Sequence, residues 1–274
     1  MGVSFHRGRL GAPIHRGALR RHPAAGTSSL MIFVGTSGWQ YGDWSGRFYP
    51  RNLPRSRWLE YFSNRYPTVE INNTFYRLPG HEAFVRWREE SAEDFVITIK
   101  ASRYITHIRR LRDCRDPLRL LWSRCRRLGD KLGPVLFQLP PRFPVDAERL
   151  RRFCRVLPSG MRAAFEFRDR SWETDEVFQI LDDAGAAFVW ADSPGARIPS
   201  IVTGSWAYVR FHAGSKLRPG YSRAKLRRWA DRVAGVDAAD VFAYFNNDAG
   251  GAALRDAQTL GRYLRARTAG VRAA

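Results

Sequence analysis

Ionisable and amide side chains recur at the C-terminal ends of the strand-like segments in this chain of 274 residues. The pattern is clearest within residues 162–172, where Phe165 and Phe167 alternate with Glu166 and Arg168. Successive side chains of a strand point to opposite faces, so the rings lie on one face and the charges on the other. Polar residues in equivalent positions are Glu70, Asn72, Lys100, Gln138, Asp192, Arg210, His212 and Asn246. Parallel barrel strands end at one shared mouth, and the sequence therefore predicts a site there.

The ionisable members of this set favour acid–base catalysis. We expect Glu166 or Asp192 to act as a general base, with His212 as its acid–base partner near neutral pH. Lys100 is expected to stabilise a developing oxyanion, with a Schiff base as the alternative. Glu70 completes the predicted catalytic set. The alternative is a polar plug of ion pairs. Buried pairs often stabilise no more than apolar residues do, so this many buried charges favour catalysis.

Further polar residues are expected to bind the substrate. Arg168 and Arg210 can bind a carboxylate or a phosphate through bidentate hydrogen bonds. The run Asn246-Asn247-Asp248 precedes two glycines and a helix start, where barrels often bind phosphate, although Asp248 is alternatively only a helix cap. The other predicted binding residues are Trp39, Asn72, Asn73, His107, Gln138 and Tyr244. The expected substrate is small and anionic (phosphorylated or carboxylated) or sugar-like.

The first predicted loop, residues 37–44, is rich in glycine and aromatic side chains. Trp39, Tyr41 and Trp44 make it too apolar for a segment that only faces solvent. These rings are expected to form either a lid over a sugar or base ring, or a hydrophobic cap over the barrel.

No cofactor is predicted. A divalent cation bound by Glu70, Glu166, Asp192 and His212 is an alternative, but nearby cationic side chains compete for these carboxylates and no second histidine stands at ligand spacing. The three cysteines lack C-x-x-C spacing, which favours reduced, structural thiols in a cytoplasmic protein over a zinc site.

The formal net charge is +20, and all but four of the 46 cationic residues are arginine. Nine arginines lie between Arg103 and Arg127, against Asp113 and Asp116. This segment is either a solvated helix face or a nucleic-acid-binding surface, and an arginine bias can also reflect genome composition. No apolar run reaches the length of a membrane span, so no membrane partner is expected. Nothing in the sequence specifies an oligomeric state.

Strand-like and helix-like segments alternate from residue 31 onward, which indicates parallel strands joined by right-handed crossovers. The predicted strands are 32–36, 69–76, 95–101, 135–139, a short strand followed by a loop within 162–172, 187–192, 207–211 and 241–245. A helix is expected after each except the sixth, where a loop is expected. Eight such units predict a single-domain (β/α)₈ barrel over residues 31–268. A disordered basic extension over 1–30 and a tail over 269–274 flank it. A doubly wound sheet is the competing fold, but the first loop lacks G-x-G-x-x-G spacing.

Eight ordered motifs resemble a known family. They are Val34-Gly35-Thr36-Ser37-Gly38-Trp39, Glu70-Ile71-Asn72-Asn73-Thr74-Phe75-Tyr76, the segment Lys100–His107, the segment Gly133–Pro141, Glu166-Phe167-Arg168, Ala191-Asp192-Ser193-Pro194, Tyr208-Val209-Arg210 and Tyr244-Phe245-Asn246-Asn247-Asp248. Together they resemble domain of unknown function 72, the YecE-like family, over about residues 31–268. The resemblance implies a TIM-type barrel and no established activity.

Three classes of function are compatible with these features. An enzyme acting on a small anionic or sugar-like substrate at the barrel mouth is favoured, without a resolved reaction type. A nucleic-acid-binding or nucleic-acid-processing protein that uses the surface of residues 103–127 is the first alternative. A barrel that binds a ligand without turnover is the second.

Overall fold

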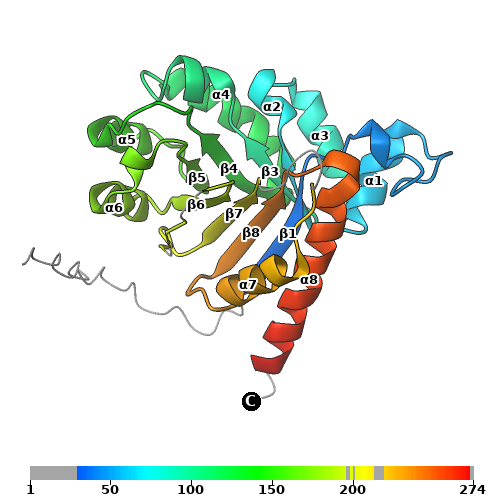
Figure 1. Cartoon of the computed structure of the whole chain (residues 1–274). Helices are drawn as coiled ribbons and strands as arrows, with labels where there is room; N and C mark the ends of the chain where they lie inside the picture. Colours follow the sequence, from blue (N-terminus) through cyan, green and yellow to red (C-terminus); the bar gives the residue numbers. More distant parts are fainter. Residues whose placement is uncertain (1–29, 196–197, 200, 213–218, 272–274) are drawn as a thin grey trace, which may run out of the picture.

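The computed structural model describes residues 30–195, 198–199, 201–212 and 219–271, which contain a closed barrel of eight parallel strands (Figure 1). The strands are β1 (Met31–Ser37), β2 (Thr68–Ile71), β3 (Val96–Lys100), β4 (Leu132–Gln138), β5 (Ala163–Glu166), β6 (Ala187–Asp192), β7 (Ala207–Phe211) and β8 (Asp240–Phe245). Each strand pairs with the next in the sequence, and β1 pairs with β8 to close the barrel. The predicted (β/α)₈ fold is confirmed. The predicted extension, apart from Leu30, lies outside the described residues.

Helices surround the barrel (Figure 1). They are α1 (Trp58–Ser63), α2 (Asn73–Tyr76), α3 (His81–Glu90), α4 (Arg115–Cys125), α5 (Ala147–Cys154), α6 (Asp175–Asp183), α7 (Arg223–Ala234) and α8 (Ala252–Val271). The described residues between β6 and β7 contain no helix, as predicted. None of the described helices is long and apolar enough to cross a membrane.

Two segments near the mouth differ from the prediction. The second strand ends at Ile71 instead of residue 76, and α2 follows it. Thr74 explains the turn, because its Oγ1 lies 3.0 Å from the carbonyl oxygen of Ile71 and 2.7 Å from that of Lys100. The expected loop after β3 contains a short π-helix, Tyr104–Ile108. Irregular helical turns of this kind are frequent at functional sites.

Apolar side chains pack in two clusters, one inside the barrel and one between the barrel and its helices. An inner apolar cluster comprises Leu136, Ala164, Ala187, Val189, Trp206, Tyr208, Phe242 and Tyr244. A larger outer cluster lies between the strands and the helices, and it includes Phe165 of β5 and Trp190 of β6. The inner cluster closes the barrel interior below the mouth. The next inward-facing residues toward the C-terminal ends of the strands are polar, and they are therefore positioned at the mouth.

Candidate functional site

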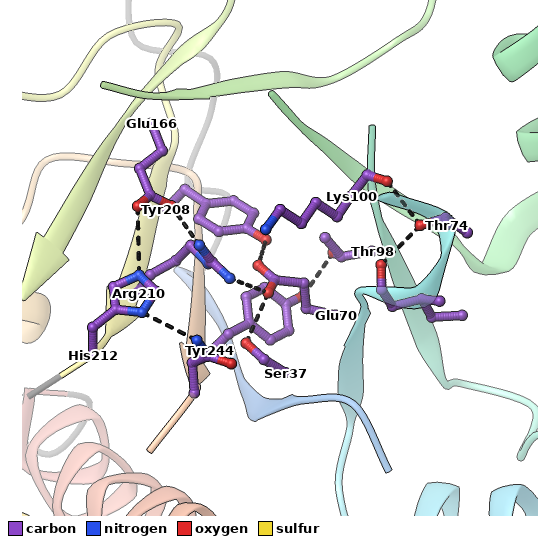
Figure 2. A network of polar contacts seen from close by, with 12 residues as sticks. Ser37, Glu70, Thr74, Thr98, Lys100, Glu166, Tyr208, Arg210, His212 and Tyr244 are labelled. Atoms are coloured by element: carbon purple, nitrogen blue, oxygen red, sulfur yellow. Dashed lines mark hydrogen bonds and ion pairs between the residues drawn. The ribbon is translucent and has the colours of Figure 1, made fainter. Parts of the chain in front are cut away.

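A buried ion-pair triad lies at the centre of the mouth (Figure 2). Arg210 of β7 reaches both Glu70 of β2 and Glu166 of β5. Its Nη2 lies 2.7 Å from Glu70 Oε1, and its Nη1 lies 2.5 Å from Glu166 Oε2. Each of the three side chains is at most 1% exposed. One guanidinium thus pairs with two carboxylates that come from strands not adjacent in the barrel.

Two hydroxyl groups complete the binding of Glu70. Ser37 Oγ of β1 donates to Oε1 at 2.7 Å, and Tyr208 Oη of β7 donates to Oε2 at 2.6 Å. The sequence analysis missed both residues. Strand alternation could have identified Tyr208, because it lies two positions before Arg210 and so shares its inward face. Ser37 ends β1, and its register partner on β2 is Glu70.

Both carboxylates of the triad are held ionised. Burial by itself would raise the pKa of Glu70, but the Arg210 charge and hydrogen bonds from Tyr208, Arg210 and Ser37 outweigh burial and lower it. Burial likewise opposes the ionised form of Glu166, and the Arg210 charge and contact with His212 hold its pKa well below the ordinary value. A carboxylate with such a low pKa is a weak proton acceptor. The pairing of Glu166 with Arg210 disfavours the role of general base, which stays a prediction.

His212 lies at the edge of the triad with a donor and an acceptor near the same ring nitrogen. Its Nε2 is 3.2 Å from Arg168 Nη2 and 3.5 Å from Glu166 Oε1. The neutral ring can accept from Arg168, whereas the protonated ring can donate to Glu166, so both protonation states have a partner. Its other nitrogen, Nδ1, lies 3.2 Å from Asn246 Nδ2. Burial, helped by the two arginine charges and opposed by Glu166, lowers the pKa of His212.

Arg168 links this histidine to the triad. Its Nε lies 2.5 Å from Glu166 Oε1, and its side chain is 27% exposed. Glu166 is completely buried, so Arg168 is the outermost member of the chain of charges. A guanidinium that is partly exposed and fixed by a buried carboxylate can bind an incoming anion.

Lys100 enters the mouth from the end of β3 (Figure 2). Its Nζ lies 4.3 Å from the centre of the Phe75 ring, and within the described chain no hydrogen bond or ion pair from Nζ is present. Burial, together with the Arg210 charge, lowers the pKa of Lys100 to about 8, against the opposing influence of Glu70 and Glu166. The amine is thus close to two carboxylates that are already paired with Arg210.

His107 extends the mouth on the same side. Its ring centre lies 5.0 Å from that of Phe75, and its Nδ1 lies 2.9 Å from Thr106 Oγ1. Burial and the charges of Lys100, Arg103 and Arg110 lower the pKa of His107. His107 therefore lies on the same side of the mouth as Lys100, and its role in binding a substrate stays a prediction.

The predicted amides of this region are distributed around the rim. Asn72 is partly buried, and its Oδ1 has no hydrogen-bond partner among the described residues. Gln138 ends β4 beside Glu166 in the strand register and is partly exposed. Asn73 and Asn246 are exposed. These amides are not hydrogen-bonded to Glu70, Arg210 or Glu166 in the described chain, so they are available to contact a ligand at the mouth.

Asp192 was predicted to be catalytic, but the structure places its carboxylate on the outer side of the barrel. Lys225 Nζ of α7 lies 2.8 Å from its Oδ2, and Trp229 Nε1 donates to the same oxygen at 2.9 Å. The strand parity explains the position. Val189 belongs to the inner cluster, so Asp192 shares the outward row with Trp190.

The proposed metal ligands are consequently not brought together, because Asp192 lies apart from Glu70, Glu166 and His212. Glu70 and Glu166 are also already paired with Arg210. Among the described residues, no group of three or more His, Cys, Asp or Glu side chains could hold a metal ion.

Four further predicted binding residues contact other residues of the chain. Tyr244 is buried below Glu70, with its Oη 2.8 Å from Thr68 Oγ1 and 2.7 Å from Thr98 Oγ1. The other three contact neighbouring side chains: Trp39 packs edge-on against Trp87, Asn247 donates to Asp256, and Asp248 accepts from Trp44. Asp248 stands at an N-cap position, without a side-chain cap hydrogen bond.

The aromatic loop forms a hydrophobic cap at Trp39 and Trp44, which are 3% and 0% exposed. Trp44 stacks near Phe62 of α1, with ring centres 6.3 Å apart. Such buried rings cannot lie over a ligand ring. The lid interpretation is therefore wrong for these two tryptophans.

Replacing Asp192 by alanine should destabilise the fold through the outer cluster. Trp229 Nε1 is buried and would lose its acceptor, and Lys225 would lose its ion-pair partner. We expect the free energy of unfolding to fall by about 1–3 kcal/mol, the usual cost of leaving a buried donor unsatisfied. Urea denaturation measures the change. Unchanged stability would show that Asp192 does not hold α7 against the barrel.

Comparison with known proteins shows which family the chain resembles. The family model described as "Protein of unknown function DUF72" matches residues 33–274. The UPF0759 protein YunF of Bacillus subtilis is 25% identical over 257 residues, which cover 81% of this chain and 90% of YunF. The UPF0759 protein YecE of Escherichia coli K12 is 31% identical over 139 residues, covering 50% of this chain and 48% of YecE.

Solved structures agree with the fold. A DUF72 family protein of Thermotoga maritima has a TM-score of 0.76 at 28% identity, with 86% of this chain and 99% of that chain covered. A DUF72 family protein of Enterococcus faecalis has a TM-score of 0.71 at 19% identity, over 87% and 99% of the two chains. At that lower identity the likeness concerns the fold alone.

Proposed function

The chain belongs to the DUF72 family of proteins of unknown function, and from this premise we propose that it is an enzyme using acid–base and electrostatic catalysis. The proposed site is the C-terminal mouth of the barrel. The proposed substrate is small and carries a phosphate or a carboxylate, or is sugar-like. The proposal leaves the reaction type open.

The observation that supports the proposal most strongly is that the Lys100 amine has no ion-pair partner among the described residues. Its amine lies in the mouth without an ion-pair partner within the described chain, although Glu70 and Glu166 are both nearby. Arg210 occupies those carboxylates instead. Lys100 is partly buried, and a plug built only for stability would be expected to pair such an amine with one of the two nearby carboxylates. An amine kept unpaired in this way is available to an anionic group or a developing negative charge.

His212 is the proposed proton acceptor. It is neutral near pH 7 because its pKa is lowered, and both of its protonation states find a partner at Nε2. The Glu70–Arg210–Glu166 triad positions Arg168 and His212 and keeps their side chains in fixed orientations. Arg168 is the proposed anion-binding residue. Glu166 is thereby a positioning residue, in place of the general base expected from the sequence.

The experiment that tests this function incubates the purified protein with a defined mixture of sugar phosphates, carboxylic acids and neutral sugars. Mass spectrometry follows the amount of each compound. The wild-type protein should consume at least one phosphorylated, carboxylated or sugar compound, and Lys100→Met should not. Lys131→Met is the matched control, because Lys131 lies outside the mouth and bonds the carbonyl oxygens of Arg88 and Ser91. Consumption that survives in Lys100→Met, or no consumption by the wild type, would contradict the proposal.

A further inference from the structure

Arginines beside the mouth form an exposed, largely unpaired surface. In the segment from Arg103 to Arg127 every arginine except Arg124 is exposed, and Arg124 is partly buried. The ion pair that this segment makes within the described chain is between Arg119 and Asp116, 3.5 Å long and open to solvent. Arg103 lies close enough to His107 for its charge to lower the pKa of that ring, so this exposed positive surface reaches the mouth.

Apolar side chains are exposed on the same surface. Six large hydrophobic residues of the described chain are exposed, and three of them lie on α2 or the π-helix: Tyr76 (74%), Tyr104 (42%) and Ile108 (60%). Tyr104 and Ile108 lie one turn apart on the π-helix, and Tyr76 ends α2. Exposed aromatic rings next to unpaired arginines are not explained by a solvated helix face, which needs no apolar side chains.

Contacts join this surface to the catalytic mouth. Arg109 Nε donates to Tyr104 Oη at 3.0 Å, and the guanidinium carbon of Arg109 lies 5.4 Å from the centre of that ring. The Phe75 ring lies 5.1 Å from the Tyr76 ring and 5.0 Å from the His107 ring. Lys100 Nζ also lies over the Phe75 ring, 4.3 Å from its centre. The rings and charges thus continue from the exterior to the amine in the mouth.

We infer that this rim surface, defined as Tyr76, Arg103, Tyr104, Ile108, Arg109 and Arg112, binds single-stranded nucleic acid. Arginines of the surface contact the phosphate backbone, and Tyr76 and Tyr104 stack on unpaired bases. A duplex offers phosphates but hides its base faces, so exposed tyrosines favour a single strand. This binding goes beyond the proposed function, because it needs no turnover at the mouth.

Fluorescence anisotropy with a labelled 15-nucleotide oligo-dT, the same length of oligo-rU and a 15-base-pair duplex tests the inference. The full chain should bind both single strands more tightly than the duplex. Affinity should fall with salt, and replacing Arg103, Arg109 and Arg112 together by glutamine should make the slope of log K against log salt shallower by about 2, at roughly 0.7 for each lost phosphate contact. Tyr76→Ala and Tyr104→Ala should each weaken single-strand binding by about fivefold or more, the effect of a lost stacking contact.

The matched control replaces Arg152, Arg155 and Arg228 by glutamine, which removes the same charge from exposed positions on α5, its C-terminal end and α7. It should leave single-strand affinity within about twofold of wild type, because only distant charge is lost. Equal weakening by both arginine triples, or equal affinity for single strand and duplex, would overturn the inference. Displacement of oligo-dT by polyglutamate as effective as displacement by unlabelled oligo-dT would also overturn it, since that result means attraction to any polyanion.

Discussion

Replacing Arg210 by methionine should lower the free energy of unfolding at neutral pH by about 3–5 kcal/mol, the cost of leaving a buried charge without its partner. The guanidinium neutralises two carboxylates that are completely buried, Glu70 and Glu166. Methionine has a similar length but offers neither charge nor hydrogen bonds. Chemical denaturation of the two proteins at pH 7 measures the loss.

The pH dependence of this loss identifies its cause. In the wild type both glutamates have lowered pKa values. Their contribution is present above the unfolded-state pKa of about 4.3 and is lost as the pH falls. Without Arg210, burial should raise both pKa values, so stability should be greatest at low pH and fall as the pH rises. The difference between the two proteins should therefore be large at pH 7 and should shrink as the pH falls below about 4.3, through the lowered pKa values of the wild type.

Two control proteins separate this effect from a general loss of an arginine. Arg57→Met removes an exposed arginine that pairs with Glu60, and it should leave the free energy of unfolding almost unchanged, because exposed ion pairs are screened by solvent. The triple variant Arg210→Met, Glu70→Gln, Glu166→Gln removes all three charges and should be more stable at pH 7 than Arg210→Met alone. A loss below about 1 kcal/mol in Arg210→Met, or one independent of pH, would show that the triad is not a buried, ionised unit.

The second large effect concerns catalysis. On whichever substrate the mixture experiment identifies, Lys100→Met should lower kcat/KM by about 10²–10⁴-fold, the usual contribution of a positioned proton-transfer or charge-stabilising group. The amine lies in the mouth, and methionine fills similar space without a charge. Steady-state kinetics measures the ratio, and Lys131→Met again serves as the control. Equal kcat/KM in wild type and Lys100→Met would exclude a catalytic role.

The pH profile of kcat/KM should then be bell-shaped. His212 acts as the neutral ring, so activity should fall as the pH drops through its pKa, which burial lowers below the ordinary value of 6.5. Lys100 acts as the protonated amine, so activity should fall as the pH rises through about 8. The alkaline limb belongs to Lys100, and the residual activity of Lys100→Met should lack it.

The barrel itself was predictable from the sequence, because the alternation of strand and helix patterns is a strong signal of parallel strands. The central charges were predictable for a related reason. Glu166 and Arg168 alternate with Phe165 and Phe167, and that alternation separates the inner from the outer face. The pairing of Glu166 with Arg210 was not predictable, since the two residues come from strands that are not adjacent in the barrel.

Asp192 shows where the sequence signal fails. Both faces of β6 are buried, so Phe188 and Trp190 do not stand out against the small inner residues Ala187 and Val189. A strand buried on both faces has no clear alternation of apolar and polar residues. Asp192 follows the last apolar residue of β6, and for that reason it was predicted to lie at the mouth. Its side chain instead points outward, like that of Trp190, and contacts α7.

The most direct test of the account is the titration of Lys100. The chain has four lysines, so selective ¹³C labelling of lysine should give at most four side-chain signals, and the Lys100→Met variant identifies the one from Lys100. An amine partly buried beside Arg210 should titrate with a midpoint of about 8. A midpoint at the ordinary value of 10.5 would mean that Lys100 is solvated and would contradict the proposed site.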